Sequence, residues 1–140
     1  TNITEINIPN GVTEIEDNVF YGANKLEKVT LGNRVTRIGK RAFASTAIQA
    51  ITIPKSVKAS GNTIFGHAGV KNKLIIKTEC ILDLEYLNSE TLVVYVPESV
   101  LSTYQSEYPN LYFKAIGKED VKKDNPDGSI EGLDRWGSIY

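Results

Sequence analysis

A pattern of apolar residues that recurs every 22 or 23 positions constrains the fold of this chain more than any other feature. In each copy an aliphatic pair comes first, a second pair follows after a turn, and a phenylalanine closes the unit. The closing residues of the three clearest copies are Phe20, Phe43 and Phe65. A fixed period in this range indicates stacked units, since one such unit cannot bury its apolar face alone. We therefore expect a solenoid.

Each copy is expected to begin with a short strand. Ile6 and Ile8 alternate with Glu5 and Asn7, a period of two that is typical of a strand with one buried face. Pro9 then removes a backbone donor and ends the strand. The same apolar positions hold Val29 and Leu31 in the second copy, and Ile51 and Ile53 in the third.

The second aliphatic pair of each copy has a different spacing. Val12 and Ile15 are three residues apart, which predicts a helical or 3₁₀ turn. Val35 and Ile38 repeat this spacing in the second copy. In the third copy Ser60 replaces the second aliphatic residue, which predicts weaker packing at one position without loss of the fold.

Two segments carry a resemblance to a known family. Ile3-Thr-Glu-Ile-Asn-Ile-Pro-Asn-Gly-Val-Thr-Glu-Ile15 and Val35-Thr-Arg-Ile-Gly-Lys-Arg-Ala-Phe43 resemble the BspA-type (Treponema pallidum type) leucine-rich repeat. The resemblance implies an α+β repeat fold, a leucine-rich-repeat solenoid with short parallel strands on the concave face and a C-terminal cap containing one helix. Members of the family are typically surface or secreted proteins of bacteria and some protists, so it also implies an extracellular or cell-surface location.

Three regions are expected along the chain. Residues 1–72 hold three leucine-rich repeats, residues 73–117 hold a degenerate repeat and the C-terminal cap, and residues 118–140 form a polar linker or tail. The chain opens inside a repeat and contains no methionine, so we expect it to be a piece of a longer protein.

The expected cap has a pattern of its own. Residues 92–96 are apolar and predict a strand that ends before Pro97. Residues 100–107 are expected to form a helix with Ser99 as its N-cap, and residues 111–116 a last short strand. This order resembles the terminal unit of BspA-type arrays, and it would cover the sheet edge that the end of a solenoid exposes.

The register of the fourth copy can be aligned in two ways. A step of 23 residues places Leu74 inward, whereas a step of 22 residues places Ile75 inward. We favour the first alignment, because Leu74 then follows Ile51 and Cys80 follows Val57 into the core. Cys80 is accordingly expected to be a small buried apolar residue.

Charge and cysteine content exclude several classes of function. Sixteen basic and seventeen acidic residues give a net charge of −1, and no basic cluster indicates a surface for nucleic acid or anionic lipid. The longest apolar run, residues 92–96, is far too short to span a bilayer, so no membrane insertion is expected within this chain. The single cysteine excludes an internal disulfide and a cysteine-based zinc cluster.

The sequence lacks the motifs of enzymes. Its only histidine, His67, lies in a Gly-His-Ala turn, and there is no nucleophile elbow, zinc-protease motif or phosphate-binding glycine loop. Acidic pairs such as Glu14 and Glu16 flank no recognisable pocket and are typical of a solvated face. We therefore expect neither enzymatic activity nor a bound cofactor.

One segment of the tail has two interpretations. Residues 123–134 match the spacing of a calcium-binding loop, with Asn125, Asp127 and Asp134 at the third, fifth and twelfth positions. Lys123 occupies the first position, where such a loop needs a carboxylate. The other interpretation is a plain Asp-Gly turn in a polar tail.

The outward residues of the predicted strands are the candidate binding residues. Equivalent side chains of neighbouring strands stack about 4.8 Å apart and form continuous rows. The rows begin polar and become apolar at the fourth copy. The predicted partner-binding residues are Glu5, Asn7, Lys28, Thr30, Thr52, Ile75, Val93 and Tyr95. A ligand is one possible cover for the apolar part, and a fold-back of the tail through Trp136 or Ile139 is the other.

The sequence thus favours a non-catalytic binding or adhesion module of a surface or secreted protein. Its expected partner is a protein or other macromolecule, including one from the extracellular space of a host, and it would bind through the sheet face. The alternative is a structural spacer that presents a neighbouring functional domain of a larger exported protein.

Overall fold

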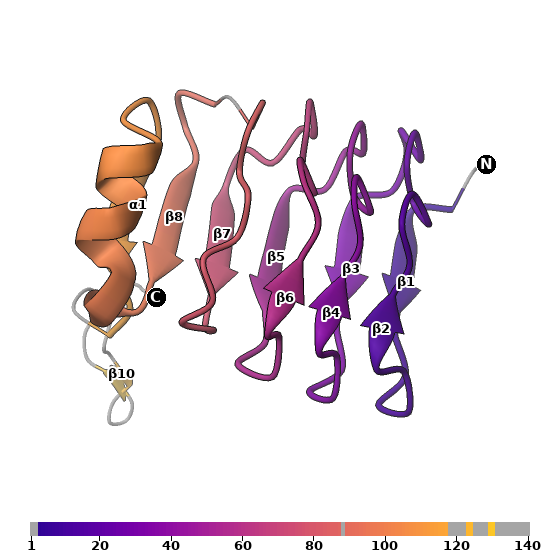
Figure 1. Cartoon of the computed structure of the whole chain (residues 1–140), viewed down its shortest axis with the longest axis horizontal. Coiled ribbons are helices and arrows are strands. Elements are labelled where there is room, and N and C mark those ends of the chain that lie inside the picture. The colour runs from indigo at the N-terminus through magenta and orange to yellow at the C-terminus, as the bar shows by residue number, and fades with distance from the viewer. Residues whose placement is uncertain (1–2, 88, 118–122, 125–128, 131–140) are drawn as a thin grey trace.

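The computed structural model describes residues 3–87, 89–117, 123–124 and 129–130. Its main element is a six-stranded sheet in which all neighbouring strands are parallel. In spatial order the strands are β1 (Glu5–Asn7), β3 (Lys28–Thr30), β5 (Ala50–Ile53), β7 (Lys73–Ile76), β8 (Val93–Val96) and β9 (Tyr112–Ala115). The chain therefore advances along one axis as a solenoid of about five turns (Figure 1). The predicted leucine-rich-repeat solenoid is confirmed.

A second, smaller sheet lies on the other side of the first three turns (Figure 1). Its parallel strands are β2 (Glu14–Ile15), β4 (Arg37–Ile38) and β6 (Ala59–Ser60). The helical or 3₁₀ turn predicted from Val12 and Ile15 is therefore wrong. The backbone bonds between turns instead: Thr36 N–H donates to the Thr13 carbonyl at 2.7 Å, and Gly39 N–H donates to the Ile15 carbonyl at 2.7 Å. Local spacing alone cannot reveal partners that lie a whole turn away.

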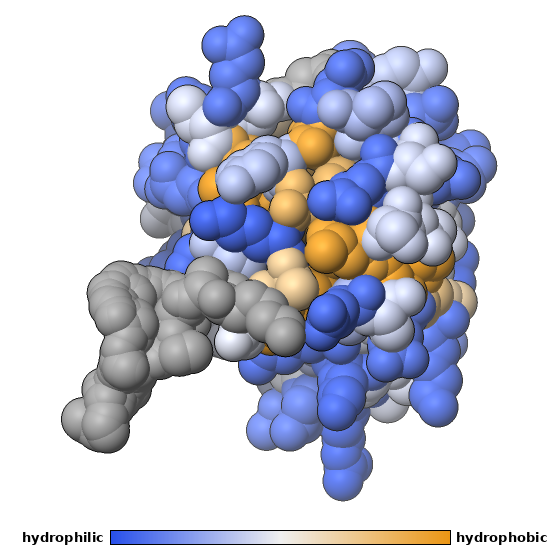
Figure 2. Space-filling view, turned by 90° about the vertical axis from the view of Figure 1, so that its left-hand side faces the viewer, coloured by the Kyte–Doolittle hydropathy of each residue, from blue (hydrophilic) through white to orange (hydrophobic). Residues whose placement is uncertain are grey.

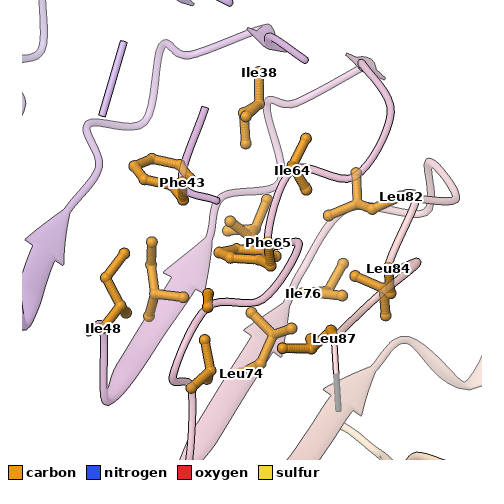
Figure 3. Close-up of a cluster of buried hydrophobic side chains, with 14 of the residues drawn as sticks. Ile38, Phe43, Ile48, Ile64, Phe65, Leu74, Ile76, Leu82, Leu84 and Leu87 are labelled. Atoms are coloured by element: carbon orange, nitrogen blue, oxygen red, sulfur yellow. The ribbon is translucent and has the colours of Figure 1, made fainter. Parts of the chain in front are cut away.

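The core lies inside the turns, between the two sheets. The ring of Phe43 stacks on Phe20 at 5.6 Å and on Phe65 at 5.8 Å, with interplanar angles of 9° and 17°. Phe43 and Phe65 are fully buried, whereas Phe20 at the first turn is half-buried. Figure 3 shows aliphatic side chains around Phe43 and Phe65, and the labelled ones are Ile38, Ile48, Ile64, Leu74, Ile76, Leu82, Leu84 and Leu87. The repeated phenylalanine thus forms one aromatic column through the three regular turns.

The fourth turn keeps the sheet register but shortens elsewhere. Ile51 pairs with Leu74, which confirms the alignment with a step of 23 residues. Thr78 occupies the buried position expected for Cys80, and its hydroxyl donates a hydrogen bond to the Val57 carbonyl. Cys80 is only half-buried, although it packs against the core, and its Sγ lies 3.2 Å from a backbone oxygen. The expectation of a buried cysteine is wrong because Thr78 follows Val57 by 21 residues, not by 23.

One α-helix lies at the C-terminal end of the solenoid. A 3₁₀ turn, η1 (Glu98–Val100), leads into α1 (Leu101–Glu107), close to the predicted range. Ser99 lies within η1 and does not cap the helix, so its predicted role is wrong; the residue at the N-cap, Val100, makes no capping side-chain bond. Strand β9 confirms the predicted last strand. Figure 2 views this end and shows apolar surface at its centre, surrounded by polar side chains.

Part of the predicted tail forms a small ladder. β10 (Lys123–Asp124) pairs antiparallel with β11 (Ser129–Ile130). The calcium-ligand candidates Asn125, Asp127 and Asp134, and the apolar Trp136 and Ile139, lie outside the described residues. Among the residues that the structure describes, no helix is both long enough and apolar enough to cross a membrane.

Candidate functional site

The outward side chains of the six-stranded sheet form two rows. One row is Glu5, Lys28, Ala50, Lys73, Val93 and Tyr112. The other row is Asn7, Thr30, Thr52, Ile75, Tyr95 and Lys114. All eight residues that the sequence singled out lie in these rows, so the fold brings them onto one face. Whether that face binds a partner stays a prediction.

The rows change in character along the solenoid. On β1, β3 and β5 the outward residues are exposed and are polar, charged or small. On β7 and β8 Ile75, Val93 and Tyr95 are half-buried and largely apolar. Tyr112 on the last strand is 59% exposed. The face therefore has a polar half and a half rich in aliphatic and aromatic groups.

Contacts within the rows involve lysines. Lys28 Nζ lies 3.9 Å from Glu5 Oε2, and both side chains are more than half exposed, so this ion pair contributes little stability. Lys73 Nζ lies 5.5 Å from the centre of the Tyr95 ring, and Lys114 Nζ lies 5.6 Å from that of Tyr112. Cation–π contacts of this kind hold the rings against the sheet.

A hollow of about 580 Å³ lies in this face. Its centre is Ala50, whose register places it between Lys28 and Lys73. Alanine fills far less space than the two lysines, so a depression remains at that rung. The described residues that line it are Lys28, Val29, Thr30, Leu31, Asn33, Ala50, Ile51, Thr52, Pro54, Lys55, Lys73, Ile75 and Lys77. Four of them are lysines and none is acidic.

Sequence reasoning missed four residues of this face. Tyr112 and Lys114 form a sixth rung, which the predicted last strand could have supplied if the rows had been extended to it. Lys55 and Lys77 follow β5 and β7 and line the hollow. Their signal in the sequence was their equal distance from Ile53 and Ile76, give or take one residue, but an alternation pattern stops at the end of the strand.

Tyrosine hydroxyls of α1 and its C-terminal flank bind the fourth turn. The Tyr104 hydroxyl accepts a hydrogen bond from Leu82 N–H at 2.8 Å and donates to the Cys80 carbonyl at 3.3 Å. The Tyr108 hydroxyl accepts from Leu84 N–H at 3.0 Å. The Tyr104 side chain is fully buried and stacks on Phe113 of β9 at 5.4 Å. These bonds fix the strand that carries the last rung of both rows.

Burial dominates the protonation of these phenols. Loss of solvent raises the pKa of Tyr104 from 10.0 to about 12, although the bond from Leu82 acts in the opposite direction. Burial likewise raises the pKa of Tyr108, against the effect of the bond from Leu84. Both hydroxyls are therefore neutral at physiological pH and act as hydrogen-bonding groups, with no role as acids or bases.

The described residues contain no arrangement typical of catalysis. His67 is exposed and stacks on Tyr86 with ring centres 5.4 Å apart. Asp17 accepts bonds from the Lys40 backbone N–H and from Arg37, which lower its pKa and hold the turn. No cluster of three or more His, Cys, Asp or Glu side chains that could hold a metal ion occurs within residues 3–87, 89–117, 123–124 and 129–130.

Comparison with known families identifies the repeat. Residues 1–106 match the BspA type leucine rich repeat region, in six copies. A search of curated proteins found no match. Repeats of this family are generally non-catalytic, typically bind proteins and typically occur in surface proteins. The match covers well over half of the chain and agrees with the parallel solenoid, and the chain therefore belongs to the BspA-type leucine-rich repeat family.

Proposed function

We propose that this chain is a non-catalytic binding module of a cell-surface or secreted protein, and that it binds another protein through the outer face of the six-stranded sheet. The observation that carries the proposal is the pair of aligned rows on that face. Together they present lysines, small polar groups and aromatic rings on one rigid surface. Aromatic residues in such a setting are typical anchors of protein interfaces.

The rest of the described surface supports the choice of this face. The second sheet has strands of only two residues and stops at β6, whereas the six-stranded sheet runs through every turn. A partner that contacts successive turns would therefore find the longer continuous surface on the six-stranded sheet. Family members typically bind proteins, which favours a protein over other macromolecules as the ligand.

The test is capture of proteins from host plasma and extracellular matrix on the immobilised chain. Tyr95→Glu places a carboxylate in the middle of the aromatic half of the face and should abolish most capture. Tyr21→Glu is the matched control, because Tyr21 is 56% exposed and lies in the turn between β2 and β3, away from the rows. Equal capture by the wild type and by Tyr95→Glu would contradict binding through this face, and would leave the spacer role as the better explanation.

A further inference from the structure

The hollow centred on Ala50 combines an unusual charge with an apolar neighbour. Lys28 and Lys73 flank Ala50 along one row, and Lys55 and Lys77 stand beyond the ends of β5 and β7. No acidic residue lines the hollow among the described residues. The chain as a whole carries a net charge of −1, so its positive charge is concentrated here and its negative charge lies elsewhere.

The four ammonium groups are available to a ligand to different degrees. Lys28 shares its charge with Glu5 across 3.9 Å at an exposed site, where water weakens the pair. Lys73 lies over the Tyr95 ring, a contact that leaves its positive charge in place. Lys55 and Lys77 form no ion pair with any described residue. A hollow surrounded by one sign of charge attracts ligands of the opposite sign.

The apolar side of the hollow narrows the chemistry of the ligand. Ile75 belongs to its lining and pairs in register with Tyr95, while the neighbouring row continues through Val93. A sulfated or carboxylated sugar chain carries hydroxyls that would gain little against two aliphatic side chains. A peptide can present a carboxylate and an apolar side chain on the same side at alternate positions, as an extended strand does.

We propose that this hollow takes an acidic segment of a protein partner, with its carboxylates over the four lysines and its apolar side chains against Ile75, Val93 and Tyr95. The proposal rests on the proposed function, since it names the chemistry of the partner for the same face. The lysines draw the segment to the face and fix its position, and the apolar contacts add affinity that salt does not screen.

The test uses a short synthetic peptide of alternating aspartate and leucine as the probe, with fluorescence anisotropy as the readout. Lys55→Glu/Lys77→Glu reverses two charges of the hollow, and should weaken binding by about tenfold or more at low salt. The matched control is Lys25→Glu/Lys58→Glu, which makes the same change in net charge at two exposed lysines outside the lining and should change affinity by less than about twofold. A peptide of alternating lysine and leucine should not bind.

Three results would overturn the proposal. The first is equal weakening by the two double variants, which would show a general charge effect. The second is equal binding of the lysine–leucine peptide, and the third is tighter binding of a heparin oligosaccharide that the hollow variant alone weakens, which would assign the hollow to a sugar chain. Protein capture separates this inference from the proposed function. If Tyr95→Glu abolishes capture but Lys55→Glu/Lys77→Glu does not, the face binds a partner and the acidic segment is wrong.

Discussion

The first three turns and the C-terminal end of this solenoid are held together by different interactions. In the regular turns the backbone bonds from one turn to the next: Phe20 N–H donates to the Ala42 carbonyl at 3.0 Å, and Phe43 N–H donates to the Ile64 carbonyl at 2.9 Å. At the C-terminal end the N–H groups of Leu82 and Leu84 donate to tyrosine hydroxyls instead. The repeat thus needs only its own pattern to continue, whereas its end needs specific side chains that stand in for the next backbone.

This difference has a consequence for stability. Interior turns of a repeat array are stabilised by contacts with both neighbours, and terminal units need a different cover. The aromatic column ends at Phe65, and the second sheet ends at β6. From there the core continues through Leu82, Leu84 and Leu87 to the rings of Tyr104 and Phe113.

The largest effect is expected in the aromatic column. Phe43→Ala removes a fully buried ring that is stacked on both sides, and should lower the free energy of unfolding by about 3 to 5 kcal/mol. Phe20→Ala should cost clearly less, because Phe20 is half-buried and is stacked on Phe43 alone. Urea unfolding measures both values, and equal losses would contradict the column as the support of the regular turns.

The next effect concerns the C-terminal end and depends on pH. Above about pH 10 the tyrosine of the unfolded chain loses its proton, while folded Tyr104 keeps its proton because its pKa is raised to about 12. The unfolded state then binds fewer protons, so this stabilising contribution is complete below pH 10 and is lost as the pH rises to 12. Two pKa units correspond to at most about 2.7 kcal/mol.

Tyr104→Phe isolates this contribution. The variant leaves Leu82 N–H without its acceptor, and should lose about 1 to 3 kcal/mol at neutral pH. Its stability should then fall less steeply than that of the wild type between pH 10 and 12, as measured by urea unfolding at each pH. Parallel pH profiles for the two proteins would show that the buried hydroxyl does not titrate as described.

Close contact between regular turns is tested by a glycine. A Cβ atom added at Gly61 would lie 2.4 Å from the Lys40 backbone nitrogen, so neighbouring turns would have to separate. Gly61→Ala should cost about 1 to 3 kcal/mol. Gly11→Ala is the control, because a Cβ there meets nothing within 4 Å, and its stability should be nearly that of the wild type. A tolerated Gly61→Ala would mean that the turns are less tightly stacked.

The smallest effect would make the third turn more regular. Ser60 pairs with Ile38 in the second sheet, is half-buried, and stands where the first two copies have isoleucine. Ser60→Val should raise the free energy of unfolding by up to about 1 kcal/mol, because it adds buried apolar groups. Thermal unfolding measures the change, and a destabilised variant would show that the serine is fitted to its site.

Much of the fold follows from the sequence because the period is fixed. Once Phe20, Phe43 and Phe65 define the step, the strands, their register and the composition of the rows follow from alternation. The second sheet does not follow, because the hydrogen-bond partners of Ile15 and Gly39 lie one turn apart and leave no local signal. The position of Cys80 was missed because the fourth turn is shorter than the period.

The candidate site was less predictable. Alternation places Lys28 and Thr52 on the outer face, but the hollow depends on the small size of Ala50 between two lysines. The net charge near zero also conceals the concentration of lysines there. The hydroxyl of Tyr104 bonds to Leu82, 22 residues earlier in the chain, and no periodic pattern predicts a bond between a side chain and a distant backbone.

Lysine footprinting tests the central claim most directly, because it needs no substitution. An amine-reactive reagent is applied to the chain with and without a protein captured from plasma or matrix, and modification of each lysine is read by mass spectrometry. The account predicts that the partner protects Lys28, Lys55, Lys73 and Lys77, while Lys25, Lys40 and Lys58 react as in the free protein. Protection of the second set with full reactivity of the first would contradict binding through the six-stranded sheet.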